Sequence, residues 1–288
     1  MPVSKLTLFT QHSRHWRENK YVYPVVSRRS KGLSIGVNLN PDTVCNFDCI
    51  YCCVDRTVPA TLREVDLDIL SAELDHMLSI AASGELFNQP PFDVTPTSLR
   101  RINDIAFSGD GEPTSFPRFG EVCRLAAVLL KAKGLDDVKL VVITNATLLQ
   151  RPSVADALRF LDQHKGEIWA KLDAGTEAYY RRVERTSIPL ARVLENIAAA
   201  GRARPVVIQS MFMHVEGQPP SEAEIEAYIE RLRELITAGC QIKLVQVYTV
   251  ARHVAEVTVT PMGDAEIDRI ADRVRAIPLP VEAYYGPT

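Results

Sequence analysis

The chain has 288 residues, of which 46% are hydrophobic and 24% are charged. This length suits one α/β barrel or two ordinary domains, and the composition is typical of a globular protein rather than a disordered or fibrous one. The net charge of −3 gives no overall attraction to nucleic acid, and we expect no DNA partner. The first residues lack the apolar core of a signal peptide and no run of about 18 apolar residues could span a membrane, so we expect a cytoplasmic protein.

Residues 1–33 are polar and carry an excess of positive charge. Charge runs of this kind are most often solvated surface, so we predict an irregular basic arm lying over the rest of the fold. The alternative, a lip that contacts phosphate groups beside an active site, stays open from the sequence. Glu18 is the only acidic residue in this segment, where it opposes Arg14, Arg17, Lys20, Arg28, Arg29 and Lys31.

After this arm, short apolar β-prone segments alternate with segments of helical periodicity. The strand segments look apolar enough to be buried on both faces, which is typical of parallel strands joined by helical crossovers. One helix opens on the capping box Ser221-x-x-Glu224. We predict strands at 33–40, 102–107, 138–143, 167–172, 205–213, 241–248 and 281–285, and helices at 67–82, 116–132, 153–164, 190–200, 221–238 and 264–276.

About six such βα repeats predict an α/β fold, namely a partial (β/α)6 barrel or an open relative of one, with short extensions at both ends. The core would occupy residues 34–250. The basic arm, 1–33, would precede it, and a C-terminal βα extension, 251–288, would pack on it.

Four of the six cysteines fall within nine positions, directly after the first predicted strand of the core. Cys45, Cys49 and Cys52 are separated by three and then two residues, so a compact loop can bring their thiolates to one metal centre. Thiolates are the usual ligands of iron–sulfur clusters, and three of them would leave one iron of a [4Fe–4S] cluster open to a non-protein ligand. Cys53 is adjacent to a ligand and is predicted not to be one. The remaining two, Cys123 and Cys240, are predicted to be buried small hydrophobic residues.

A structural zinc site is the competing interpretation of the same three cysteines. It would need a fourth protein ligand, for which His12 and His15 are the candidates. Structural zinc sites prefer paired Cys-x2-Cys units, and the sequence does not provide two of them, which favours the iron–sulfur cluster.

A second motif follows the next predicted strand. Residues 108–114 read Ser-Gly-Asp-Gly-Glu-Pro-Thr, in which glycines allow close backbone approach and acidic groups can accept from an ammonium. Together with the Cys-x3-Cys-x2-Cys loop and its aromatic Tyr51, this segment resembles the radical S-adenosylmethionine (SAM) superfamily. The resemblance implies a [4Fe–4S] cluster held by the three cysteines, SAM bound to the open iron, and reductive cleavage of SAM to a 5′-deoxyadenosyl radical that abstracts a hydrogen atom from a substrate.

The resemblance also implies where SAM is bound. Its ammonium would be received by the motif Gly109, Asp110, Gly111 and Glu112, with Asp110 standing where many members have a glycine. The ends of the later strands would contact the rest of SAM, because barrel enzymes place functional residues at the carboxyl ends of strands. These candidates are Tyr51, Asn145, Lys171, Asp173, Gln209 and Met211, with Gln246, Tyr248 and Arg252 as further contacts to SAM or substrate.

Within the superfamily, the segments around 27–41, 108–114 and 246–252 look most similar to iron–sulfur oxidoreductases related to wyosine-type tRNA-modifying enzymes. That similarity implies a role in tRNA modification and a flavodoxin- or ferredoxin-type protein as reductant. The substrate stays open between RNA, protein and a small molecule. Two alternatives also stay open, a glycyl-radical-type activase acting on a partner protein and a non-catalytic iron–sulfur binding protein.

Overall fold

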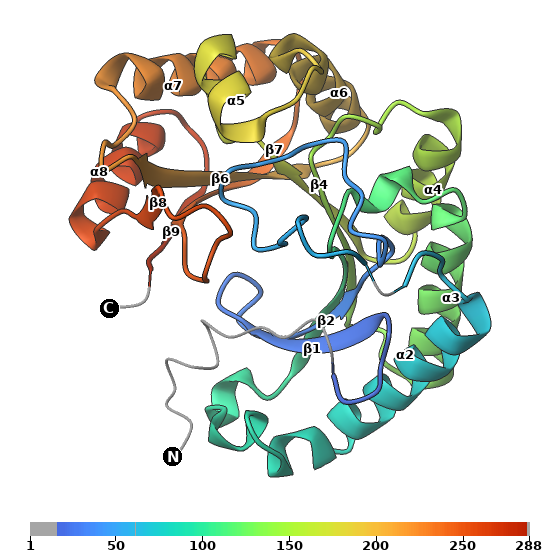
Figure 1. Cartoon of the computed structure of the whole chain (residues 1–288). Coiled ribbons are helices and arrows are strands. Elements are labelled where there is room, and N and C mark those ends of the chain that lie inside the picture. Colours follow the sequence, from blue (N-terminus) through green and yellow to red (C-terminus); the bar gives the residue numbers. More distant parts are fainter. Residues whose placement is uncertain (1–15, 61, 287–288) are drawn as a thin grey trace. The chain divides into compact units, whose positions relative to one another are not determined.

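The computed structural model describes residues 16–60 and 62–286, and in it the chain forms two compact α/β units (Figure 1). The first unit contains the chain up to Cys45 together with Val58–Ile143 and Pro152–Glu167. The second contains Asn46–Thr57, Thr144–Arg151 and Ile168–Thr288. The chain passes from the first unit to the second between Cys45 and Asn46, inside the cysteine loop.

Four strands form the sheet of the first unit. The first two pair antiparallel, and the second, third and fourth pair parallel. Three helices lie along the outer side of these strands (Figure 1). The strands are β1 (Val22–Ser27), β2 (Gly32–Val37), β3 (Ile102–Phe107) and β4 (Lys139–Thr144), and the helices are α2 (Leu67–Ala82), α3 (Phe119–Ala132) and α4 (Pro152–Asp162).

The second unit holds four parallel strands in the order β5-β6-β7-β9, and a short strand, β8, pairs antiparallel with β6. Its helices lie on one side of this sheet (Figure 1). The strands are β5 (Gly166–Lys171), β6 (Val206–Val215), β7 (Ile242–Thr249), β8 (Val259–Pro261) and β9 (Val281–Tyr284), and the helices are α5 (Glu177–Glu184), α6 (Leu190–Ala203), α7 (Glu222–Thr237) and α8 (Asp264–Arg275).

The predicted alternation of strands and helices is confirmed, and most boundaries agree within three residues. The elements that the sequence pattern missed are β1, α5, β8 and four 3₁₀ turns. The turns are η1 (Glu85–Asn88), η2 (Phe92–Val94), η3 (Thr97–Leu99) and η4 (Pro113–Ser115). The expected domain boundaries near residues 33 and 250 stay predictions.

The prediction of an irregular arm up to residue 33 is wrong for residues 22–27, which form β1. The cause is a distant contact. The carboxylate of Glu73 on α2 accepts hydrogen bonds from the backbone of Lys20, Tyr21 and Val22 at 2.7, 2.9 and 3.1 Å, and so holds the start of the strand. Arg14 lies outside the described residues, and the predicted phosphate-contacting lip stays a prediction.

The capping box predicted for α7 is half confirmed. Ser221 is the N-cap and accepts from the backbone N–H of Glu224 at 3.2 Å. The side chain of Glu224 does not turn back to Ser221. It accepts instead from the backbone N–H of Gly175 and the hydroxyl of Thr176, both at 2.5 Å, and therefore holds the loop that leaves β5.

The two faces of the second sheet differ in what covers them. On β6, the hydroxyl of Ser210 lies 2.6 Å from that of Tyr228 on α7, and Phe212 packs edge-to-face on the same ring. Side chains alternate between faces along a strand, so Gln209 and Met211 point to the face opposite α7. This opposite face carries most of the polar residues of the candidate site.

None of the helices within the described ranges combines the length and the apolar character needed to cross a bilayer.

Asp104 on β3 provides a test of this core. Burial raises the pKa of its carboxyl group from 3.8 to about 6, although Ser34 donates a hydrogen bond to it. A raised pKa in the folded state means that ionising Asp104 destabilises the fold. The free energy of unfolding therefore falls as the pH rises from about 4 to about 6, and above pH 6 the loss is constant at about 3 kcal/mol. We expect Asp104→Asn to increase the free energy of unfolding above pH 6 and to be neutral below pH 4, as measured by urea denaturation across this range. A stabilisation that does not change with pH would contradict this account.

Candidate functional site

The second unit contains most of the cysteine loop, and the end of α5 holds this part of the loop in place. The backbone N–H groups of Asp48 and Ile50 donate to the carbonyl oxygens of Glu184 and Val183 at 3.1 and 2.9 Å. The last carbonyls of a helix have no partner within the helix, so they are available to accept from another segment. The far end of the loop is also held, because Ala255 donates to the carbonyl oxygen of Cys52 at 3.0 Å.

The Glu184 side chain also contacts the cysteine loop. Its carboxyl group is buried and lies 2.6 Å from the thiol of Cys49 and 2.8 Å from the hydroxyl of Tyr51. Burial, and then the negative charge of Asp173, raises the pKa of Glu184 to about 8. Burial, reinforced by Glu184, likewise raises the pKa of the Cys49 thiol. Glu184 could not be identified from the sequence, because it ends a short polar helix that the periodicity did not predict.

Asn145 ties the start of this loop segment to the turn after β4. Its side-chain N–H group donates to the side-chain oxygen of Asn46 at 2.7 Å, and Asn46 donates to the hydroxyl of Thr147 at the same distance. The oxygen of Asn145 accepts from the hydroxyl of Thr147 at 2.7 Å, which closes a three-residue ring. Asn145 was predicted to contact SAM. In this structure it positions the cysteine loop, and the contact to SAM stays a prediction.

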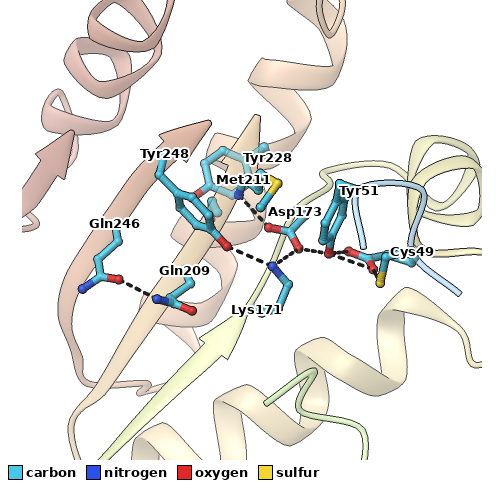
Figure 2. Close-up of polar contacts among 11 residues, drawn as sticks. Cys49, Tyr51, Lys171, Asp173, Gln209, Met211, Tyr228, Gln246 and Tyr248 are labelled. Carbon is cyan, nitrogen blue, oxygen red and sulfur yellow. Dashed lines mark hydrogen bonds and ion pairs between the residues drawn. The ribbon is translucent and has the colours of Figure 1, made fainter. Parts of the chain in front are cut away.

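Lys171 and Asp173 lie on one face, as their spacing predicts, and they form an ion pair of 3.0 Å (Figure 2). Asp173 also accepts from the hydroxyl of Tyr51 and from the backbone N–H of Met211, both at 2.6 Å. The ammonium of Lys171 donates to the hydroxyl of Tyr248 at 3.0 Å and lies 4.7 Å from the centre of the Tyr51 ring. Burial lowers the pKa of Lys171, but the charges of Asp173 and its neighbours more than offset this, so the pKa is raised and the residue stays a cation.

Gln209 and Met211 lie one behind the other on β6, beside this ion pair. The amide N–H of Gln209 donates to the side-chain oxygen of Gln246 on β7 at 2.8 Å, and both glutamines are buried (Figure 2). Met211 is level with Tyr248 of β7. The structure therefore brings together Tyr51, Lys171, Asp173, Gln209 and Met211, all of which were predicted from the sequence as site residues.

The second motif lies in the first unit, where its glycines allow close packing. A Cβ atom on Gly109 would lie 2.3 Å from the side-chain oxygen of Asn38. One on Gly111 would lie 2.2 Å from the carbonyl oxygen of Val44, the residue before Cys45. Any side chain at these positions would displace either the end of β2 or the start of the cysteine loop. The glycines thus have a structural reason beyond the predicted approach to an ammonium group.

The acidic side chains of this motif already accept hydrogen bonds from neighbouring residues. Asp110 accepts from the side-chain amide of Asn38 at 2.5 Å, and its own backbone N–H donates back to Asn38 at 3.1 Å. Glu112 is buried and is the N-cap of η4, where it accepts from the backbone N–H of Thr114 at 3.1 Å. The predicted ammonium contacts of these residues stay predictions.

The donor set suits an iron–sulfur cluster, since all three loop cysteines are free thiols with partly exposed side chains. Cys123 and Cys240 are buried, as predicted, and Cys53 is exposed. Among residues 16–60 and 62–286, no three His, Cys, Asp or Glu side chains are grouped as a metal site. The convergence of Cys45, Cys49 and Cys52 on one cluster stays a prediction. The candidate zinc ligands His12 and His15 lie outside the described residues.

We expect Glu184→Ala to loosen the cysteine loop, because it removes the hydrogen-bond partner of both Cys49 and Tyr51 at a buried position. A lost buried partner of this kind costs about 1–3 kcal/mol. The melting temperature should fall, amide hydrogen exchange of residues 46–52 should become faster, and less iron should be bound per chain after anaerobic reconstitution. Glu184→Gln should lose less, since it keeps the size and one acceptor, and Glu195→Ala, at an exposed glutamate, is the matched control. Unchanged exchange in Glu184→Ala would contradict the positioning role.

Comparisons with known proteins show sequence relatives. No family model matches the chain. A UPF0026 protein of Helicobacter pylori strain J99 is 25% identical over 226 residues, which are 77% of this chain and 65% of that protein. One from H. pylori strain 26695 is 30% identical over 60% of this chain and 49% of its own length, and one from Methanocaldococcus jannaschii is 26% identical over 61% and 48%. The chain thus spans between about half and two thirds of the length of these curated relatives.

Solved structures show the fold. SuiB of Streptococcus suis, solved with S-adenosylmethionine bound, aligns with a TM-score of 0.59 and 13% identity over 89% of this chain and 52% of its own. TYW1, solved with a lysine–pyruvate adduct, aligns with a TM-score of 0.50 and 15% identity over 94% and 80%. The chain is thus similar in sequence to UPF0026 proteins and shares the α/β fold of SuiB and TYW1, which confirms the predicted fold class.

Proposed function

We propose that this protein is a radical SAM enzyme that cleaves SAM reductively to methionine and a 5′-deoxyadenosyl radical, which abstracts a hydrogen atom from a substrate. The observation that carries the proposal is the attachment of the cysteine loop to a buried polar cluster. Through Tyr51 and Glu184, the loop contacts Asp173 and Lys171 at the end of β5. The part of the loop that carries Cys49 and Cys52 is thereby fixed beside strand ends that can bind a polar cofactor.

Cys45, Cys49 and Cys52 would hold a [4Fe–4S] cluster, which when bound supplies the electron that breaks the bond between sulfur and C5′ of SAM. The protein's own residues would bind SAM and hold the cysteine loop in position. Glu184 and Asn145 hold the loop that presents two of the thiols. In the first unit, the packing of Gly111 against Val44 fixes the residue that precedes the third thiol, Cys45.

Lys171 and Asp173 would orient the ribose and carboxylate of SAM. Asp173 uses both of its oxygens, one on Met211 and the other on Tyr51 and Lys171, so its position is fixed before SAM binds. A group held in this way costs little reorganisation when the cofactor arrives. On β6, Gln209 and Met211 would contact the rest of SAM, and on β7, Gln246 and Tyr248 would contact SAM or substrate.

A flavodoxin- or ferredoxin-type protein would deliver the electron, and cytoplasmic location belongs to the same proposal. A role in tRNA modification stays a prediction from the sequence. No observation in the structure favours the two alternatives, a glycyl-radical-type activase or a non-catalytic iron–sulfur protein.

The central test is anaerobic reconstitution with iron and sulfide, followed by SAM and dithionite. We expect 5′-deoxyadenosine, measured by chromatography, and a change in the electron paramagnetic resonance spectrum of the reduced cluster when SAM is added. Cys49→Ala should abolish both, whereas Cys53→Ser, at the exposed neighbouring cysteine, is the matched control and should retain both. A fully loaded cluster whose spectrum ignores SAM would overturn the proposal.

Glu112→Gln separates the binding role of this residue from its structural role. Glutamine keeps an oxygen that can cap η4, so iron content and melting temperature should stay close to those of the unmodified protein. The lost negative charge should weaken SAM binding about 10-fold or more, because hydrogen bonds to charged groups contribute about 1.5–3 kcal/mol. SAM affinity measured by equilibrium dialysis checks this. Equal loss of iron would show that Glu112 serves the loop rather than SAM.

A further inference from the structure

We propose that Arg56 raises the reduction potential of the iron–sulfur cluster by donating a hydrogen bond, and placing a positive charge, at the sulfur atom of one of the cluster's ligands, Cys52. This role rests on the proposed function only in needing a cluster bound by Cys52, and it depends on neither SAM nor the substrate. The cysteine motif does not include Arg56, which lies four residues beyond Cys52 in the sequence.

The contact between the two residues is direct. A guanidinium N–H of Arg56 donates to the Cys52 sulfur, with 3.2 Å between nitrogen and sulfur. A guanidinium keeps its positive charge under all conditions in which proteins are folded, and a thiolate bound to iron keeps lone pairs that can accept a hydrogen bond. Cys52 can therefore bind iron and accept from Arg56 at the same time. The contact is half-buried, so solvent and salt screen the charge only in part.

Both partners are held in place by their own neighbours in the second unit. The carbonyl oxygen of Cys52 accepts from the backbone N–H of Ala255 at 3.0 Å. The Asp55 carboxylate accepts from the backbone N–H and the hydroxyl of Thr57 at 2.9 and 2.6 Å, and this fixes the turn that carries Arg56. The donor and the acceptor are thus positioned before a cluster binds, and little reorganisation is needed when it does.

The neighbouring ligand has a different kind of partner. The thiol of Cys49 lies 2.6 Å from the carboxyl group of Glu184, which can supply no positive charge to a cluster. Lys171, the buried cation of the same unit, forms its ion pair with Asp173 at 3.0 Å. Arg56, by contrast, donates to the ligand sulfur itself. The second unit therefore places positive charge directly on a cluster ligand through Arg56.

A charge at this position has a defined effect on reduction. One electron passes from the reductant to the cluster, and no bond to Arg56 forms or breaks. The cluster and its three thiolates become more negative by one unit, so a fixed cation beside a ligand sulfur stabilises the reduced form more than the oxidised form. Net charge and hydrogen bonds to the sulfur atoms are among the factors that set the potentials of iron–sulfur clusters. Arg56 should therefore make the cluster easier for a flavodoxin- or ferredoxin-type protein to reduce.

The experiment uses the full chain, reconstituted anaerobically with iron and sulfide and kept free of SAM. The midpoint potential of the cluster is measured by a dithionite titration with redox mediators, followed by electron paramagnetic resonance. Iron bound per chain is measured on the same samples, and SAM affinity is measured separately by equilibrium dialysis. Arg56→Gln removes the charge and keeps an N–H donor, whereas Arg56→Lys keeps the charge. Arg192→Gln, at an exposed arginine on α6, is the matched control for a lost positive charge.

We expect Arg56→Gln to lower the equilibrium constant for reduction about 10-fold, which is a midpoint potential lower by about 59 mV for one electron. Arg56→Lys should show a clearly smaller shift, since the charge remains and only the geometry of the donor changes. Arg192→Gln should show no shift. Iron content and SAM affinity should stay unchanged in all three variants.

An unchanged potential in Arg56→Gln would overturn the proposal, as would an equal shift in Arg56→Lys or in Arg192→Gln. Loss of iron in both Arg56 variants would show a structural role, and loss of SAM affinity without a change in potential would show a SAM ligand, and each of these results also overturns it. If the potential shifts as expected but no 5′-deoxyadenosine forms when SAM and dithionite are added, the role of Arg56 stands and the proposed reaction fails.

Discussion

The ammonium group of Lys171 is the charge on which the polar interior of the second unit depends. Asp173 and Glu184 are both buried, and the hydroxyl of Tyr51 lies between them. Two buried carboxylates so close together would repel if both were ionised and unpaired. Lys171 forms an ion pair with Asp173, and burial followed by the negative charge of Asp173 raises the pKa of Glu184 to about 8. The cysteine loop is attached to this arrangement through Tyr51 and Cys49, so the geometry of the thiols depends on a charge balance set at the end of β5.

The carboxyl end of β5 is also held by a contact between helix α7 and the loop that follows the strand. Glu224, at the start of α7, accepts from the backbone of Gly175 and from Thr176, in the loop that joins β5 to α5. That loop carries Asp173 at its beginning and leads into the helix whose last residue is Glu184. A Cβ atom on Gly175 would lie 2.0 Å from the backbone nitrogen of Tyr228, so α7 packs directly against the loop. The packing of α7 thus determines the positions of both carboxylates and, through them, of the cysteine loop.

The sequence predicted what depends on local pattern and could not predict what depends on distant partners. The buried parallel strands, the helix Leu67–Ala82 and the placement of Lys171 and Asp173 on one face follow from periodicity and spacing, and they are confirmed. By contrast, β1 was missed because Glu73 of α2 holds its start, and only half of the capping box formed because the Glu224 side chain accepts from Gly175 and Thr176 instead. The residue most closely joined to the loop, Glu184, ends a short charged helix with no apolar periodicity to reveal it. Its importance is visible only once the fold places it against Cys49.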